Sequence, residues 1–427
     1  MKYSIDSYRM YQCGGMFSHV IRVVVTMKET VDIASLKKSA NTAIKRYPYF
    51  AVKVTVDEYG GYVLQPNHEP VAVLFAGKKV PKVGSGEVNG HLLFLEVDGK
   101  TISFYISHTL GGGKGVLPWV MTTVYQYVTD KYHVLLDAPG IRKSDSELYS
   151  DETVEPSLEM LPNIQPSFEY KSKNPIQLSG DYLNGLFNPF KRNPNYRLYT
   201  FQQNDVVSAA RKYNTSVSGL FLAAMALALS KVLPEKDRVI GGEIAHSPMP
   251  NLGFPNAHSD ILSHVHIDYD REKLQPELMK QLGTMTKEQI KLQTDVSVSS
   301  DDLRKLFTLY GELDDIKGLK QKRKFIKRHN PSTSKEAKHG TYIVNYSGQM
   351  DWGEVADYVD SYVIVVEGHL ILELTSMNDR IFISFMQLMI DAKYTNAFQQ
   401  TLEELHIPFE TSGSFPKRLS KHDIPLR

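Results

Sequence analysis

A strand that runs directly into a glycine-rich loop and then into a helix is the feature that most restricts how this chain can fold. Residues 91–97 and 101–106 are apolar stretches joined by an Asp-Gly pair, which favours a tight β-hairpin. Apolar and polar residues alternate along the second stretch, so one of its faces is expected to be buried. It leads straight into Ser-His-Thr-Leu-Gly-Gly-Gly at 107–113, and a helix is predicted over 116–128. The chain thus joins a rigid strand to a loop with unusual backbone freedom.

The same kinds of element occur on both sides of this motif. In the first half we expect strands over 19–27, 50–56 and 62–64 and a helix over 33–47 capped by Asp32. In the second half we expect strands over 196–201, 238–246, 262–267, 341–346, 361–366, 370–375 and 380–386, with helices over 204–213, 218–232, 271–316 and 392–405.

A stretch rich in Pro, Ser, Asp and Asn, residues 137–194, separates the two halves and is typical of a linker. The chain has 427 residues, which is long for a single hydrophobic core. The sequence therefore predicts an α/β fold with two lobes, 1–190 and 191–427, each a mixed sheet flanked by helices.

Composition excludes several classes of function. Lys and Arg number 49 against 48 Asp and Glu, so neither nucleic acid nor an anionic membrane is an expected partner. Cys13 is the sole cysteine, which excludes an internal disulfide and a multi-cysteine metal site. The longest apolar run, 220–229, is about half of the ~20 residues that a membrane span needs, and the first twenty residues have no apolar segment typical of a signal peptide. We expect a cytoplasmic protein, monomeric or dimeric.

His108 is the main candidate for chemistry. It follows a buried strand, which would hold it rigidly, and it precedes three glycines, which allow close approach of a ligand. An unperturbed imidazole titrates near neutral pH, so His108 could act as a general base. On position alone, a structural histidine bonded to a loop carbonyl fits equally well.

Two other site types fit the sequence poorly. A phosphate-binding Walker loop around Lys114 would need Gly at position 108 and Ser or Thr at position 115, where the chain has His and Gly. His264 and His266 share a strand face and could bind a metal with Asp260 or His258, but spacing fixes no third ligand. We expect no metal.

The segment Ser107–Gly113 resembles the HHxxxDG motif of the coenzyme A-dependent acyltransferase superfamily, which includes chloramphenicol acetyltransferase, alcohol acetyltransferases, plant acyltransferases and the condensation domains of peptide synthetases. His108 falls on the second, catalytic histidine and Gly113 on the final glycine. Ser107 replaces the first histidine, and Gly111 precedes the aspartate position. Gly112 replaces the aspartate, which in the family pairs with an arginine to shape the site.

Other segments resemble the same superfamily in the same order. Residues 341–348 are similar to the strand that crosses between the lobes beside the catalytic histidine, and 383–410 are similar to the C-terminal strand and helix of alcohol acetyltransferases. The resemblance implies two chloramphenicol acetyltransferase-like lobes with a tunnel between them. It implies acyl-CoA as co-substrate, no permanently bound cofactor, and a small alcohol or amine as acceptor.

In this mechanism, Asn345 and Ser347 are candidates to stabilise the oxyanion, because alternation along the strand puts both side chains on one face. They fit equally as ordinary edge and turn residues. An acyl carrier protein remains an alternative donor. Because the motif aspartate is replaced by Gly112, a binding protein that keeps the fold without turnover is the competing interpretation.

The sequence also draws attention to two further segments. Trp352 follows the expected crossing strand and is typical of a hydrophobic loop anchor. A basic segment could meet the phosphates of coenzyme A or could simply be solvated. It contains Lys317, Lys320, Lys322, Arg323, Lys324, Lys327 and Arg328.

Overall fold

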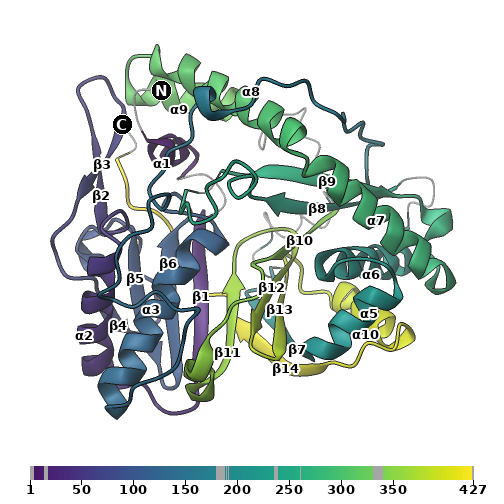
Figure 1. The fold of residues 1–427 in the computed structure, drawn as a ribbon, viewed down its shortest axis with the longest axis horizontal. Helices are drawn as coiled ribbons and strands as arrows, with labels where there is room; N and C mark the ends of the chain where they lie inside the picture. Colours follow the sequence, from purple (N-terminus) through teal and green to yellow (C-terminus); the bar gives the residue numbers. More distant parts are fainter. Residues whose placement is uncertain are drawn as a thin grey trace.

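Two mixed β-sheets and the helices around them make up most of the chain (Figure 1). The computed structural model describes residues 4–13, 18–178, 188, 190, 192–234, 239–259, 261–329 and 340–425. Among these residues the sheets have five strands in the order β11-β1-β6-β5-β4 and seven strands in the order β14-β7-β13-β12-β10-β8-β9. We refer to them as the first and the second sheet.

The first sheet is built around β1, which pairs antiparallel with β6 on one side and with β11 on the other. Its strands are β1 (Val20–Met27), β4 (Val73–Phe75), β5 (Leu93–Asp98), β6 (Thr101–Ser107) and β11 (Val359–Val365). The helices α2 (Ile33–Ala43) and α3 (Gly113–Tyr132) pack against one another beside it. A separate hairpin joins β2 (Val52–Val56) to β3 (Tyr62–Pro66).

Local sequence signals explain how several of these elements begin and turn. The carboxylate of Asp32 accepts a hydrogen bond from the Ser35 amide at 2.8 Å and caps α2 as expected. The β5–β6 hairpin turns at Gly99 and Lys100, with Asp98 paired to Thr101, and only Gly99 takes a left-handed φ, of 58°. The expected Asp98-Gly99 turn is therefore shifted by one residue, because Asp98 still pairs within the ladder.

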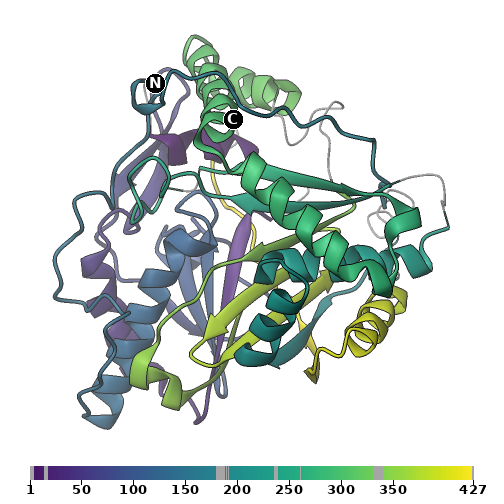
Figure 2. The ribbon, with the colours of Figure 1, turned by 45° about the vertical axis from the view of Figure 1, so that its right-hand side comes forward.

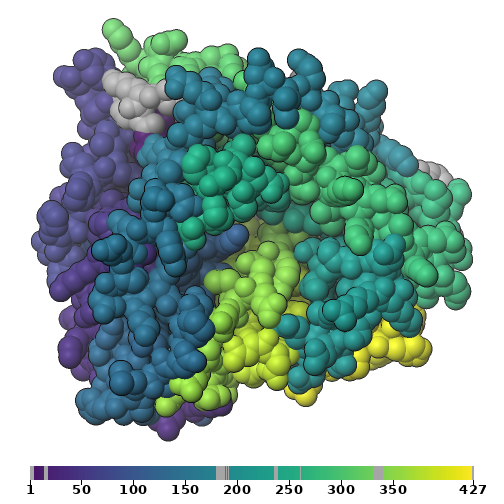
Figure 3. All heavy atoms as spheres, in the orientation of Figure 1, coloured from purple at the N-terminus to yellow at the C-terminus, as the bar shows by residue number. Residues whose placement is uncertain are grey.

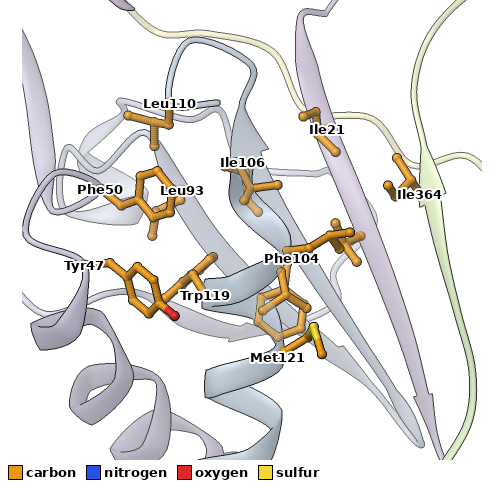
Figure 4. Close-up of a cluster of buried hydrophobic side chains, with 14 of the residues drawn as sticks. Ile21, Tyr47, Phe50, Leu93, Phe104, Ile106, Leu110, Trp119, Met121 and Ile364 are labelled. Carbon is orange, nitrogen blue, oxygen red and sulfur yellow. The ribbon is translucent and has the colours of Figure 1, made fainter. Parts of the chain in front are cut away.

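A dense aromatic and aliphatic core lies between the first sheet and α3 (Figure 4). The rings of Phe104 on β6 and Trp119 on α3 meet edge to face, with centroids 5.5 Å apart. Ile364 of β11 belongs to the same cluster, although it is far away in sequence. Burial of such side chains contributes about 25 cal/mol for each Å² of apolar surface, and it fixes the strand that ends at the candidate base.

The second sheet has β10 near its centre, parallel to both of its neighbours, β12 and β8. Its strands are β7 (Asn195–Gln202), β8 (Ile240–His246), β9 (Ser263–Tyr269), β10 (Tyr342–Tyr346), β12 (Leu370–Met377), β13 (Arg380–Gln387) and β14 (Glu410–Pro416). Because parallel and antiparallel pairs occur in both sheets, the predicted mixed α/β fold is confirmed.

Helices cover the second sheet and extend beyond it (Figures 1 and 2). They are α5 (Gln203–Lys212), α6 (Val217–Val232), α7 (Met279–Gln293), α8 (Val296–Asp314), α9 (Leu319–His329) and α10 (Lys393–Glu404), and a short α1 (Ile5–Arg9) lies near the start of the chain. The 3₁₀ turns are Met10–Gln12, Ile44–Arg46, Gly86–Val88, Leu158–Met160, Arg271–Lys273, Pro276–Leu278 and Gly353–Tyr358. The apolar, alanine-rich α6 is almost wholly buried and packs on β8, β10, α7 and α10.

The strand that passes between the sheets is β11, which corrects the expectation for 341–348. That segment does form β10, but its pairing partners on both sides are strands of the second sheet. The strand β11 comes from the second half of the chain and pairs with β1 of the first sheet. Because β12 and β8 occupy both edges of β10, β10 cannot pair with a strand of the first sheet.

The stretch from 137 to 178 has little regular structure but is not a loose linker. Glu152 within it is fully buried and forms ion pairs with Arg46, at 2.9 Å, and with Arg142. The hydroxyl of Tyr49 also donates to the Glu152 carboxylate, at 3.1 Å. Glu152 thus fastens the stretch to the segment that follows α2, a long-range contact that periodicity could not show.

In the part of the chain that the structure describes, no single helix is long and apolar enough to cross a membrane. The pair α5 and α6 passes that test only when taken together, across a bend of 75°.

Candidate active site

A cavity of about 630 Å³ lies where the two sheets meet, and residues from both halves of the chain line it. Figure 3 shows the surface hollowed near the centre of the molecule, between the blue N-terminal half and the green and teal second half. The polar side chains that line the cavity include His108, Lys114, His246, Asn345, Ser347 and Glu373. The structure thus brings together the three residues expected to carry chemistry, His108, Asn345 and Ser347.

His108 lies at the end of β6, half-buried, with its side chain in the cavity lining. Its backbone amide donates to the carbonyl of His19 at 2.9 Å, which holds the end of the strand in place. On the ring, Nδ1 lies 3.4 Å from a guanidinium nitrogen of Arg9. A guanidinium can only donate, so this contact is a hydrogen bond in the tautomer whose Nδ1 carries no proton.

Ser107 faces away from the cavity and is fully buried. Its hydroxyl lies 2.7 Å from Nε2 of His422, and Nδ1 of His422 lies 3.0 Å from the Ser18 carbonyl. Since the carbonyl must accept from Nδ1–H, Ser107 is the donor to Nε2. Burial, followed by the nearby charges of His19 and His108, lowers the pKa of His422 to about 4. The residue at the motif's first position therefore anchors the C-terminal segment.

The glycines of the motif make room for a backbone carbonyl. A Cβ at Gly111 would lie 2.8 Å from the carbonyl oxygen of His258, and one at Gly115 would lie 2.3 Å from it. At Gly113 the nearest atom is a flexible one, Cδ1 of Ile364, at 3.3 Å. Gly112 is the N-cap of α3 and offers no side-chain hydrogen bond. The backbone of the loop that contains His258 thus packs directly against the start of α3.

That loop is fixed through the His258 ring. Its Nδ1 donates to the Glu152 carbonyl at 2.6 Å, its Nε2 lies 3.5 Å from the Asp6 carboxylate, and it stacks on Tyr49. Burial disfavours the charged ring, but the hydrogen bond and charge of Asp6 raise the pKa of His258 above its usual value. Because these partners occupy both ring nitrogens, the role of His258 is to hold the loop in place.

Asn345 and Glu373 form the polar floor of the cavity. The Asn345 amide nitrogen donates to Oε1 of Glu373 at 2.8 Å, and its amide oxygen accepts from the Ala245 backbone at 3.1 Å. Burial raises the pKa of Glu373 to about 7, although the Asn345 hydrogen bond and the charge of His108 lower it. Asn345 retains a second amide hydrogen, whereas the Ser347 hydroxyl already donates to the Leu374 carbonyl at 3.3 Å.

Lys114 is the exposed cation of the cavity lining, in the first turn of α3. Burial and then the charge of Lys114 lower the pKa of His246, which also lines the cavity. The sequence did not single out Lys114 as a ligand-binding residue, because the glycines around it suggested a phosphate loop that the spacing excludes.

The basic segment between 317 and 328 lies apart from this cavity. It forms most of α9, where Lys322 is fully buried and donates to the Leu313 carbonyl at 2.5 Å. Arg323 donates to the Tyr62 hydroxyl at 3.0 Å and to the Cys13 carbonyl at 2.8 Å. Lys322 thus ties α9 to the end of α8, and Arg323 ties α9 to Tyr62 and Cys13 in the first half of the chain. None of the seven cations lines the cavity.

The histidine pair on β9 belongs to an ion-pair network. His264 lies 2.7 Å from the Glu243 carboxylate, and the charges of the two histidines contribute to holding the pKa of Glu243 near 2 despite its burial. Asp260 lies outside the described residues. Within the described residues no group of three or more metal-binding side chains occurs. Trp352 is fully buried and packs against Tyr362, as expected for a loop anchor.

Sequence comparison finds no relative: no family model matches the chain, and neither does any curated protein. The fold, however, has solved counterparts. Polyketide synthase associated protein 5 from Mycobacterium tuberculosis matches with a TM-score of 0.59 and 11% identity, over 93% of this chain and 96% of that one. F. graminearum TRI101, solved with coenzyme A and T-2 mycotoxin, matches with a TM-score of 0.59 and 10% identity, over 97% of this chain and 100% of that one.

A third counterpart is the first condensation domain of the CDA synthetase, with a TM-score of 0.54, 11% identity, and 97% of each chain covered. The chain shares its two-lobed mixed α/β fold with these solved proteins. The resemblance drawn from Ser107–Gly113 is confirmed at the level of the fold. At about 10% identity the counterparts show architecture alone.

Sequence reasoning missed one prominent residue of the cavity, Glu373. The signal was present, because Glu373 is a single acid inside the apolar run 370–374. A carboxylate at such a position must either reach solvent or be stabilised by a partner, since burying an unpaired carboxylate is costly. Arg9 carries no comparable signal, because its proximity to His108 depends on how α1 docks.

Proposed function

We propose that the protein transfers an acyl group from acyl-CoA to an alcohol or amine, with His108 as general base. The observation that carries this proposal is the position of His108: it ends a buried strand of one sheet and shares a cavity with Asn345 of the other. The superfamily fold supports it, since F. graminearum TRI101 was solved with coenzyme A and a small-molecule acceptor.

In the proposed reaction His108 removes the acceptor proton as the acceptor oxygen or nitrogen bonds to the thioester carbonyl carbon. The tetrahedral oxyanion accepts a hydrogen bond from the second amide hydrogen of Asn345. The C–S bond then breaks, and the leaving thiolate receives the proton from the imidazolium. A general base of this kind accelerates the reaction roughly 10²–10⁴-fold, and one oxyanion donor about 10²–10³-fold.

The contact between Arg9 and His108 must break during this cycle. A base has to present an unprotonated nitrogen to the acceptor, and in the tautomer that accepts from Arg9 that nitrogen is Nδ1. The acceptor therefore displaces Arg9 from Nδ1, or binds Nε2 after the ring proton has moved to Nδ1. At 3.4 Å the contact is long and correspondingly weak.

A binding protein without turnover is the competing function, and Gly112 is the observation that favours it. The superfamily motif carries an aspartate at this position, whereas Gly112 caps α3 without any side-chain bond. A second variant of the proposal takes the acyl group from a carrier protein, as the fold shared with the CDA synthetase condensation domain permits.

Thiol release separates these functions. The protein is incubated with acetyl-CoA and a panel of alcohols and amines, and free thiol is followed for wild type and for His108→Ala. Acceptor-dependent release that falls at least ~10²-fold in His108→Ala supports His108 as the base. Tight coenzyme A binding without turnover on any acceptor supports the binding protein. Turnover only when an acylated carrier protein replaces acetyl-CoA supports the carrier protein as donor.

A further inference from the structure

Glu373 is a buried acid in the cavity that the proposed mechanism does not use. It lies in the middle of β12, opposite Asn345 on β10, and only 7% of its surface is exposed. Among the residues that the structure describes, it is the only carboxyl group lining the cavity. Buried acids are expensive unless paired, so its presence calls for a partner or a ligand.

The carboxyl group is held in one orientation by the sheet. Its Oε1 accepts from the Asn345 amide, which is itself fixed by the Ala245 backbone of β8. Its Oε2 accepts no hydrogen bond from the described residues, and no salt bridge to the carboxyl occurs among them. Besides Glu373, the titratable residues that line the cavity are His108, which directly follows β6, Lys114 from α3, His246 from β8, His258 from the loop before β9 and Tyr346 from β10.

The number of protons that must leave distinguishes the two acceptor classes. An alcohol loses one proton when it becomes an ester. An alkyl amine, which is an ammonium ion at neutral pH, must lose two protons when it becomes an amide. One general base, His108, is sufficient for the alcohol, whereas the ammonium requires a second proton acceptor.

Resting on the proposed function, we propose that Glu373 binds the acceptor and that this acceptor is a primary alkyl amine. The ammonium group donates to Oε2 and gives its first proton to the carboxylate, which leaves a neutral amine and a carboxylic acid. The amine nitrogen bonds to the thioester carbonyl, His108 takes the second proton, and the C–S bond breaks. The thiolate receives the proton of His108, and Glu373 releases its own to solvent.

The electrostatics of the site agree with this role. A pKa of about 7 lets Glu373 lose and regain a proton near neutral pH. The charge of an incoming ammonium would favour the carboxylate form, as any cation within a few ångströms does. The hydrogen bond from Asn345 remains in place in both forms, so the carboxyl does not need to reorient.

The test compares benzylamine with benzyl alcohol, two acceptors of similar shape, using acetyl-CoA as donor. The variant Glu373→Gln keeps an oxygen for Asn345 and loses the ability to take a proton. Glu243→Gln is the matched control, because Glu243 is an equally buried glutamate of the second sheet that does not line the cavity. We expect Glu373→Gln to lower kcat/KM for benzylamine about 10²-fold at pH 7 and to leave benzyl alcohol within about twofold.

A pH profile excludes a merely structural effect. In Glu373→Gln, kcat/KM for benzylamine should recover as the pH rises toward the pKa of the amine, because the neutral amine then binds directly. Equal losses for both acceptors, or a loss without recovery at high pH, would overturn the role of Glu373. If wild type acetylates benzyl alcohol but not benzylamine, the amine proposal fails and acyl transfer stands. If wild type acetylates neither, nor any other acceptor in the panel, the proposed function itself fails.

Discussion

Asn345 and Glu373 lie opposite one another on parallel neighbouring strands, and the amide of the first donates to the carboxyl of the second at 2.8 Å. The same amide accepts from the backbone of β8, so one side chain links three adjacent strands at the cavity floor. Asn345 therefore links the stability of the second sheet to the protonation of Glu373. Substitutions at Asn345 or Glu373 should change both the free energy of unfolding and the protonation of the cavity.

Asn345→Ala is expected to destabilise the protein and to raise the pKa of Glu373 further. The substitution leaves the Ala245 amide and the Glu373 carboxyl without their partner, at a cost of about 1–3 kcal/mol. Urea unfolding at pH 7 measures the loss. Asn345→Asp would keep the acceptor for Ala245, so it serves as the comparison; an alanine variant as stable as wild type would contradict the linking role.

Glu373→Gln should become more stable relative to wild type as the pH rises. The folded pKa of about 7 exceeds the usual value of 4.5, so the folded state holds the proton more tightly than the unfolded state. The resulting stabilisation is complete below pH 4.5 and is lost as the pH rises through 7, by about 1.4 kcal/mol for each pH unit. Glutamine does not titrate, so the difference between the two unfolding free energies should grow from pH 5 to pH 8. A constant difference would contradict the raised pKa.

Ser107→Ala is expected to lower stability without lowering the turnover of the folded enzyme. The Ser107 hydroxyl is the donor to His422 and does not reach the cavity, so its loss costs about 1–3 kcal/mol and leaves His108 in place. Thermal unfolding and kcat, measured on the same preparation, test both parts. A large fall in kcat with an unchanged Tm would show that Ser107 acts in the reaction.

Gly115→Ala should be more harmful than Gly113→Ala, although both residues belong to the same run. A methyl group at 115 meets the backbone carbonyl of His258 at 2.3 Å, while one at 113 meets a side-chain methyl at 3.3 Å that can turn aside. We expect the first to cost about 1–3 kcal/mol and the second less than half of that. Equal losses of unfolding free energy, measured by urea unfolding, would contradict the close approach of the His258 carbonyl to Gly115.

Lys114→Ala should raise KM for acyl-CoA and leave kcat nearly unchanged. Lys114 is exposed at the cavity lining, where it can meet a phosphate of coenzyme A, and the proposed reaction assigns it no proton to transfer. For an exposed charge the effect is small, about 2- to 5-fold, and it should diminish with added salt. Lys320→Ala on α9 is the control, because that residue does not line the cavity. An equal effect at both positions would indicate non-specific attraction.

Much of the fold could be predicted because its signals are local. Asp32 caps α2 through an amide three residues away, and the alternation along 101–106 marks the buried face of β6. The position of His108 between that strand and the glycines follows from the same short segment. The short strands β4 and β14 were missed, since three residues or a fully exposed run carry little periodic signal.

The sequence by itself determined that a histidine would stand at the end of a buried strand, because strand alternation and a glycine run act within a few residues. Only the tertiary structure decided what surrounds it. The contacts of Ser107 with His422, of Gly115 with the His258 carbonyl, and of Asn345 with Glu373 all join distant segments. Strand pairing and the burial of polar groups depend on which segments pack together, and no local pattern encodes that choice.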